Sequence, residues 1–251
     1  MADSADFDLR CHPDDGRLQL EAWRKNCAAP IALDVTARAP TDASASGMLV
    51  VLSWNVWIGH GRLLELTSRR RNGDFIDQGA TPDAELVVLA QEVYRSDSAI
   101  PLDATKHAGR HPAIKAGHQR EEIVETAQAL GMNLRYAPSM RNAGLQSDRG
   151  NAILSTLPLE AAYAIELPFV IQRRVAVAAT IRLAGESVCV VSAHLDPSQR
   201  IVVGTRTLRG CHSVPIVHCC RLLLPWLASK TGMSSQPLPC FRRSPFHRGP
   251  Q

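Results

Sequence analysis

The chain has 251 residues, 45% hydrophobic and 21% charged, so it can bury a sizeable core and is not a globally disordered protein. No apolar run reaches the roughly 18 residues of a membrane span, and the acidic start MADSADFDLR lacks an apolar stretch, so we expect neither a transmembrane helix nor a secretory signal. The net charge of +4 is uneven, because residues 197–251 hold no acid, and the seven irregularly spaced cysteines favour a reducing, cytoplasmic location.

The N-terminal half begins with residues 1–47, where charges, prolines and small residues predict a loosely structured extension. Met48–Asn55 (MLVVLSWN) is apolar enough to predict a strand buried on both faces, and Arg62–Arg71 predicts a helix. Leu86–Ala90 predicts a second buried strand, which we expect to end at the polar pair that follows it. Ser96–Gly117, with its prolines and glycine, predicts a long loop.

The rest of the apolar pattern alternates one helix with several strands. Gln119–Leu130 has apolar residues at helical spacing and is closed by Gly131, which predicts a helix. The last two predicted strands face each other across LAGES, which predicts a hairpin with Gly185 in its turn. Strands broken by a few helices predict an α+β or α/β layered domain. The predicted strands are Leu134–Ala137, Asn151–Ser155, Ala161–Leu167, Val175–Leu183 and Ser187–His194.

Three predicted strands finish on polar residues that suit phosphate chemistry. Asn55 ends the first strand, Glu92 follows the second, and His194 ends the hairpin. Sites collect where strands end, because the sheet fixes the side chains while the loops leave room for a ligand. A carboxylate can ligate Mg²⁺, and an imidazole can donate to a phosphoryl oxygen. Each residue alone also fits an ordinary structural role, as a turn former, a solvated carboxylate or a structural imidazole, and only the joint pattern indicates a site.

Four segments in this order, SWNVW, AQEVYR, RGNAILS and VVSAHLD, resemble the endonuclease/exonuclease/phosphatase superfamily. That metal-dependent group includes pancreatic deoxyribonuclease, abasic-site endonucleases, neutral sphingomyelinases and inositol phosphatases. The resemblance covers Leu49–Asp196 and implies a domain over residues 48–196. It implies a four-layer α/β sandwich, in which two mixed β-sheets are flanked by helices, incomplete at the C-terminus of this chain.

The resemblance also implies hydrolysis of a phosphoester by a metal-activated water, in line and without a covalent intermediate. Glu92 would be the carboxylate ligand of Mg²⁺ or Mn²⁺, and Asn55 would sit beside the metal. His194 would bind the scissile phosphate, while Gly150 and Asn151 would line the site. The pair Arg173 and Arg174 lies near a position where family nucleases contact phosphate, and we assign the phosphate contact to Arg174. The predicted catalytic residues are His194, Asn55 and Asn151, and Asp196 is given no firm role.

The chain departs from the family after Asp196. Members carry a Gly-Asp-x-Asn motif and a terminal Asp-His pair, but residues 197–251 contain no Asp and hold seven Arg and one Lys. We favour an out-of-frame or scrambled terminus, against a divergent native tail or a zinc module. The thiols and imidazoles of such a module would be Cys211, His212, His218, Cys219, Cys220 and Cys240.

Two functions follow from the sequence. The first is a metal-dependent nuclease or phosphodiesterase, impaired by the loss of the two C-terminal motifs. The alternative is a non-catalytic remnant, or a nucleic-acid-binding protein with a basic, divergent or disordered tail at 197–251. The substrate is a phosphoester, with DNA and RNA among the candidates, and the sequence indicates no obligate protein partner.

Overall fold

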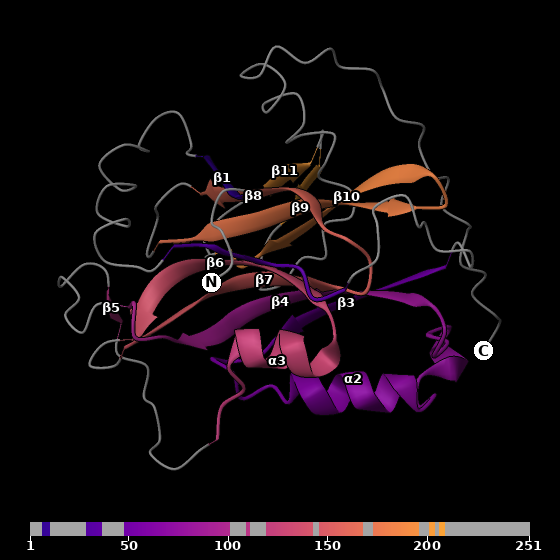
Figure 1. Ribbon diagram of the computed structural model, residues 1–251. Helices are drawn as coiled ribbons and strands as arrows, with labels where there is room; N and C mark the ends of the chain where they lie inside the picture. Colours follow the sequence, from indigo (N-terminus) through magenta and orange to yellow (C-terminus); the bar gives the residue numbers. More distant parts are fainter. Residues whose placement is uncertain are drawn as a thin grey trace, which may run out of the picture. The chain divides into compact units, whose positions relative to one another are not determined.

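The computed structural model describes residues 7–10, 29–36, 48–100, 109–110, 119–142, 146–167, 173–195, 201–203 and 206–208 (Figure 1). The chain divides into two units, Met1–Val217 and His218–Gln251, and every described residue lies in the first. The described part forms two principal β-sheets with two α-helices, so the fold is a mixed α and β fold.

The larger sheet has six strands in the order β2-β6-β7-β4-β3, with β5 paired to β6. β3 runs parallel to β4, and β5 runs parallel to β6, whereas the other neighbours are antiparallel. The sheet therefore combines a parallel crossover from β3 to β4 with an antiparallel pair of consecutive strands, β6 and β7. Its strands are β2 Ile31–Leu33, β3 Leu49–Asn55, β4 Glu85–Ser96, β5 Gly109–Arg110, β6 Asn133–Asn142 and β7 Ser147–Ser155.

The smaller sheet has four strands in the order β1-β8-β9-β10, of which β1 is parallel to β8 and the others are antiparallel. The predicted hairpin is confirmed, because β9 and β10 pair along their full lengths across Ala184 and Gly185, both at positive φ. The strands are β1 Phe7–Arg10, β8 Glu160–Glu166, β9 Val175–Leu183 and β10 Glu186–Ala193. A separate antiparallel ribbon joins β11 Ile201–Val203 to β12 Arg206–Leu208.

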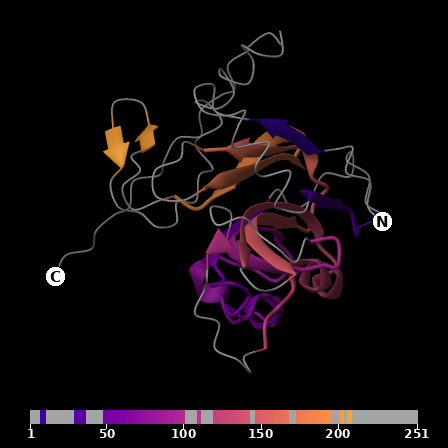
Figure 2. The ribbon, with the colours of Figure 1, turned by 90° about the vertical axis from the view of Figure 1, so that its left-hand side faces the viewer.

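Strand alternation gives the larger sheet two apolar faces. In β4, Val87 and Leu89 belong to a buried cluster that includes residues of β8, β9 and β10, so this face packs on the smaller sheet (Figure 2). Leu86, Val88 and Ala90 belong to a second cluster, which includes the two helices. The continuous apolar run LVVLA is thus buried on both sides, as its composition predicts.

Both α-helices lie against the outer face of the larger sheet (Figure 1). α2 spans Leu63–Arg71, close to its predicted range, and α3 spans Ile123–Leu130, starting four residues later than expected. α3 begins late because the Glu122 carboxylate caps it, accepting from the backbone N–H groups of Val124 and Glu125. It ends at Gly131, which takes a left-handed conformation as predicted. A short 3-10 helix, η2, spans Ile76–Gln78.

Several element boundaries differ from those predicted. β4 does not end after Ala90 but continues to Ser96, because β7 is long enough to pair with the polar half of the strand. β7 begins at Ser147, four residues before the predicted strand Asn151–Ser155. The segment 1–47, predicted as a loose extension, contributes β1 and β2. Most of its other residues lie outside the described ranges.

The described part of the chain contains three layers rather than four. Helices cover the larger sheet, but within the described ranges no helix packs on the outer face of the smaller sheet. Among the helices of those ranges, none is long and apolar enough to cross a membrane. Asp196, the proposed zinc-module residues and most of the predicted loop 96–117 lie outside the described residues.

Candidate functional site

A row of three amides crosses adjacent strands of the larger sheet, at the end of β3 and in the middle of β4 and β7. Asn55 at the end of β3 pairs in register with Gln91 of β4, and Gln91 pairs in register with Asn151 of β7. Residues two apart on a strand lie on the same face, so Gln91 shares the inner face with Leu89 and Asn151 shares it with Ile153. On this inner face, the apolar residues Leu89 and Ile153 are therefore followed by a row of polar side chains.

Gln91 connects the two sheets at the centre of this row. Its side-chain nitrogen donates to the Leu89 carbonyl at 2.7 Å and contacts the hydroxyls of Ser53 and Ser192 at 3.5 and 3.4 Å. Ser192, from β10, in turn donates to the Ala90 carbonyl at 2.9 Å. The side-chain oxygen of Gln91 is buried and has no hydrogen-bond partner among the described residues. A buried acceptor in that state calls for a water molecule or an ion.

Glu92 lies at a β-bulge, where the pairing of β4 with β7 shifts by one residue. It has φ +54, which is uncommon for a residue with a side chain. The bulge reverses the alternation, because Val93 joins the apolar cluster on the helix side, the same side as Ala90 three residues earlier. Glu92 is thus the inserted residue, and its carboxylate is released from the regular face pattern of the strand.

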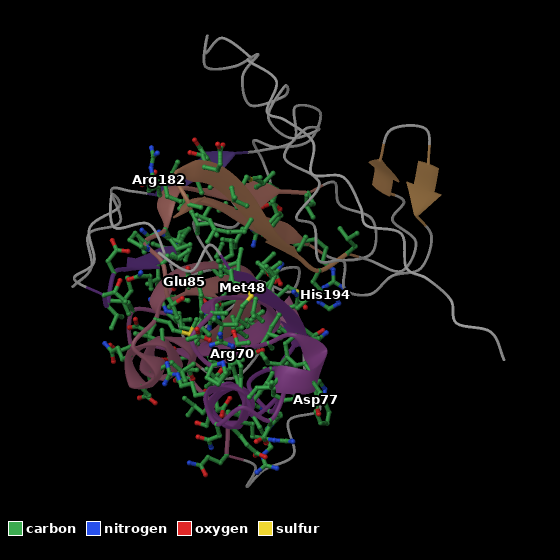
Figure 3. The ribbon with its side chains drawn as sticks, turned by 90° about the vertical axis from the view of Figure 1, so that its right-hand side faces the viewer. Met48, Arg70, Asp77, Glu85, Arg182 and His194 are labelled. Atoms are coloured by element: carbon green, nitrogen blue, oxygen red, sulfur yellow. The ribbon has the colours of Figure 1, made fainter. Side chains whose placement is uncertain are left out.

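His194 directly follows β10 and is buried, with 8% of its surface exposed. Figure 3 shows it at the edge of the molecule where the two sheets face each other. Its Nδ1 lies 3.4 Å from Oε1 of Glu92, so two residues from different sheets meet here. The same Nδ1 lies 3.1 Å from a guanidinium nitrogen of Arg174.

The contact with Arg174 determines which ring nitrogen of a neutral His194 carries the proton. A guanidinium can only donate, so Nδ1 must accept, and the proton of the neutral ring resides on Nε2. A protonated ring would instead direct its Nδ1–H toward Glu92. The neutral His194 ring therefore accepts a hydrogen bond from Arg174, whereas the protonated ring would donate one to Glu92.

The two asparagines of the row have defined structural partners. The side-chain oxygen of Asn55 accepts from the Trp57 backbone N–H at 2.9 Å, and Asn55 is exposed at the sheet end. The side-chain nitrogen of Asn151 donates to the Val175 carbonyl at 2.6 Å, which ties β7 to β9. Gly150 precedes it at a close strand contact, where a Cβ would lie 2.0 Å from the Ala137 carbonyl oxygen. Roles of these residues in chemistry stay predictions.

The two arginines of the predicted phosphate contact serve different purposes. Arg173 forms a two-pronged pair with Glu166, at 2.8 and 2.6 Å from its carboxylate oxygens, and donates to the carbonyls of Pro138 and Ser139. Burial raises the pKa of Glu166, and the Arg173 charge and hydrogen bonds lower it in part. Arg173 therefore joins the smaller sheet to β6, while Arg174 contacts His194.

The oxygen donors near the bulge fit a hard divalent cation only in part. Glu92 supplies one carboxylate, and Asn55 and Gln91 supply amide oxygens at neighbouring positions of the row. Among the residues that the structure describes, no group of three His, Cys, Asp or Glu could hold a metal. A donor set of this kind suits Mg²⁺, which keeps several waters and is bound through one or two carboxylates together with substrate phosphates.

The sequence predicts Asn55, Glu92 and His194 for the site, but it does not single out Gln91, the central amide of the row. The second strand was predicted to end at Gln91. Because Gln91 lies two residues after Leu89 in β4, both side chains lie on the same face of the sheet. The signal that could have found it was this alternation, extended by one residue. The bulge at Glu92 had no comparable signal.

Comparisons with known proteins add little to this geometry. No protein-family model matches the chain, and no curated protein matches it. Among solved structures, the chain is similar to the selenomethionine form of TDP2 from Caenorhabditis elegans, at 20% sequence identity and a TM-score of 0.30. The match covers 59% of this chain and 35% of that one.

Proposed function

We propose that the chain is a metal-dependent phosphoester hydrolase of the endonuclease/exonuclease/phosphatase type. The observation that carries the proposal is the meeting of Glu92 and His194, 3.4 Å apart, from two motifs that lie in the family order. Asn55 joins them through its register with Gln91, the neighbour of Glu92. In the complete family fold, a second layer of helices would cover the smaller sheet and give the four-layer sandwich.

Glu92 and Asn55 would hold Mg²⁺ or Mn²⁺, with the buried oxygen of Gln91 beside them. When bound, the cation supplies charge stabilisation and a more acidic water at the phosphate. The bulge suits Glu92 to this task, because it takes the carboxylate out of the apolar faces of β4 while the flanking pairs keep its backbone fixed. The amides of Asn55 and Gln91 would supply oxygen ligands without adding further negative charge.

His194 would bind the phosphoryl group through Nε2–H. The Arg174 contact holds Nδ1 as an acceptor, so the donor proton stays on the other nitrogen. A donor placed at a phosphoryl oxygen stabilises the charge that develops there in the transition state. Arg174 is then a positioning residue, because it orients the His194 ring. Its positive charge lies beside the same imidazole that would bind the phosphoryl group.

The chain lacks the family's water-polarising Asp and its terminal His. Loss of a group that activates the nucleophile lowers a rate by about 10²- to 10⁴-fold. We therefore expect slow hydrolysis by this chain compared with a complete family domain, with the binding of metal and phosphate better preserved than turnover.

The experiment compares the full chain with its E92Q variant, in hydrolysis of bis-p-nitrophenyl phosphate and in plasmid nicking. With Mg²⁺ or Mn²⁺ present, E92Q should lose about 100-fold or more of the activity, and EDTA should abolish the activity of the unmodified chain. The matched control is E160Q, because Glu160 is a similarly accessible carboxylate on the smaller sheet. Equal activity in E92Q and E160Q, or activity in EDTA, would refute the site.

The alternative function is nucleic-acid binding by a non-catalytic remnant, which the absence of acids in residues 197–251 favours. If the basic tail contacts phosphates, affinity for DNA should fall steeply as salt concentration rises. Salt-independent binding would exclude this alternative.

A further inference from the structure

An indole ring lies exposed beside the candidate site. Trp57 is 67% exposed, more than any other large apolar side chain in the described residues. It lies two residues after Asn55, and its backbone N–H donates to the Asn55 side chain. Its ring contacts that of His60, with centroids 5.5 Å apart and planes inclined at 57°. Contact of an apolar ring with water is unfavourable, so a ligand that covers the ring would gain free energy.

The loop that carries Trp57 is held firmly. Its first residue, Val56, donates to the Gln91 carbonyl at 2.9 Å, and Gly61 donates back to Val56 at 2.9 Å. The Gly59 carbonyl accepts from Glu121 at 2.9 Å. A Cβ on Gly59 would come within 2.8 Å of the Glu121 carbonyl oxygen, so the loop is packed against its neighbour. The ring is therefore presented from a rigid support, which lowers the entropy lost when a ligand stacks on it.

The backbone of this loop is strained in a way that exposes the ring. Trp57 and Ile58 both have positive φ, at 43 and 56, although neither is glycine. The turn places Ile58 in the interior, 6% exposed, and leaves the larger side chain of Trp57 exposed. Such strain persists only where the surroundings enforce it, and it is concentrated at ligand sites.

The chemistry of the surroundings favours a nucleobase over a lipid as the occupant. Membrane insertion uses several apolar side chains in one patch. The other large apolar side chains exposed in the described ranges are Met48 at the start of β3, Ile76 in η2, and Trp54, whose indole N–H already donates to Gly61. Trp57 is instead accompanied by the His60 ring, and its backbone N–H donates to Asn55, which is assigned to the metal. A flat ring beside a phosphate site matches a nucleotide, in which a base is one sugar away from the phosphate.

We infer that Trp57 is a stacking platform for an unpaired base of a single-stranded nucleic acid whose phosphate occupies the Glu92–His194 site. This deepens the proposed function and rests on it for the position of the phosphate. Stacking on an aromatic ring accepts every base, because each has a π-face, so the platform selects nucleic acids over lipid and inositol phosphoesters without reading sequence. A base in a duplex is already stacked, so single strands are the preferred ligand.

The experiment uses the full chain and a short single-stranded DNA with 2-aminopurine at one position, in EDTA to prevent hydrolysis. Fluorescence quenching reports stacking directly, and a matched strand of abasic tetrahydrofuran residues reports the contribution of the bases. The unmodified chain should quench the probe and bind the base-containing strand about tenfold more tightly than the abasic strand. W57A should remove both effects, and W57F should retain most of each. I76A, which removes another exposed apolar side chain, should behave as the unmodified chain does.

Each result decides the inference. Undiminished quenching and unchanged discrimination in W57A would overturn it, as would an unmodified chain that binds both strands equally. Loss in W57A of binding to phosphatidylcholine vesicles, without any preference for the base-containing strand, would show a lipid platform and overturn it too. The assay contains no metal and requires no turnover. Base stacking that survives while E92Q keeps full activity would therefore refute the proposed hydrolase site but not the platform.

Discussion

Arg174 carries the sharpest prediction at the scale of single residues. Its side chain is 5% exposed and contacts Nδ1 of His194 at 3.1 Å. In R174Q the ring loses a partner that can only donate, so His194 can place its proton on either nitrogen and rotate toward Glu92. We expect kcat/KM to fall roughly tenfold or more, mostly through kcat, with R174K losing less. The pH–rate profile should also change shape, because a cation no longer opposes protonation of the ring.

The matched control for R174Q is R182Q. Arg182 belongs to the same hairpin but is half exposed and pairs with Glu160 near the turn, at the opposite end from His194 (Figure 3). R182Q should leave both the rate and the pH profile unchanged. If R174Q lowers only thermal stability and keeps the profile of R182Q, then Arg174 is a structural residue and has no positioning role.

For single residues, the sequence predicts which residue types belong to the candidate site, but not their backbone conformations or their hydrogen-bond partners. Asn55, Glu92 and His194 stand out in the sequence because each follows or ends an apolar run, although Glu92 lies at a bulge within β4 and not at a strand end. The left-handed conformation of Glu92 was not recognisable, since only the shifted pairing of β4 and β7 enforces it. The separate tasks of Arg173 and Arg174 were equally hidden, because they depend on partners far along the chain.

At the scale of elements, the stability that the capping residue Glu122 gives to the start of helix α3 should depend on pH. Burial raises the pKa of its capping residue Glu122, and the hydrogen bonds from Glu125 and Val124 oppose that shift. A raised pKa means that the folded state binds more protons than the unfolded state, so this contribution to stability is present at low pH and is lost as pH rises through the folded value. E122Q cannot titrate. Its free energy of unfolding, relative to the unmodified chain, should therefore increase from about pH 4 to pH 7.

Urea unfolding at several pH values measures this difference, and E125Q is the control. Glu125 is an exposed carboxylate in the first turn of the same helix. A constant difference between E122Q and the unmodified chain across the range would contradict the prediction. So would an equal trend in E125Q, which would indicate a general effect of charge at the start of the helix rather than burial of Glu122.

Element types were easier to predict than element boundaries, and β4 shows why. The run LVVLA identifies a strand by itself, but its polar continuation to Ser96 is a strand only because β7 supplies hydrogen-bond partners as far as Ser147. β1 and β2 have four and three residues, too few for any periodicity, and they exist by pairing with β8 and β6. The apolar pattern of the sequence therefore predicts which segments form strands, whereas the partner strands determine where each strand ends.

For the whole molecule, the packing of the two sheets follows from alternation that is visible in the sequence. Val87, Leu89 and Ile153 face Val177 and Ile181 across the interior, and apolar burial of this kind is non-directional. The polar contacts near the candidate site are directional, so they determine how the two sheets are placed against each other there. They include Ser192 to Ala90, Asn151 to Val175, and Arg173 to the carbonyls of β6.

Arg173, which donates to the β6 carbonyls, also forms a buried pair with Glu166, and this pair supports a prediction for the whole fold. Glu166 is 3% exposed, and R173M would leave its carboxylate buried without a cation. Removing one partner of a buried pair costs about 3–5 kcal/mol, and R173M should lower the free energy of unfolding by that order near neutral pH. Removal of both charges in E166Q/R173M should recover much of the loss, because no isolated charge then remains.

The same pair fixes the sign of the pH dependence. Burial already raises the pKa of Glu166, and the guanidinium of Arg173 holds it down, so R173M raises it further. The folded R173M protein then keeps a proton that the unfolded chain releases, and its stability falls as pH rises through the folded value. Denaturant unfolding should show a small deficit for R173M in acid and a growing one toward neutral pH, while E166Q/R173M shows no such trend. A deficit in R173M that is the same at every pH would mean that lost packing, rather than the uncompensated carboxylate, accounts for the cost.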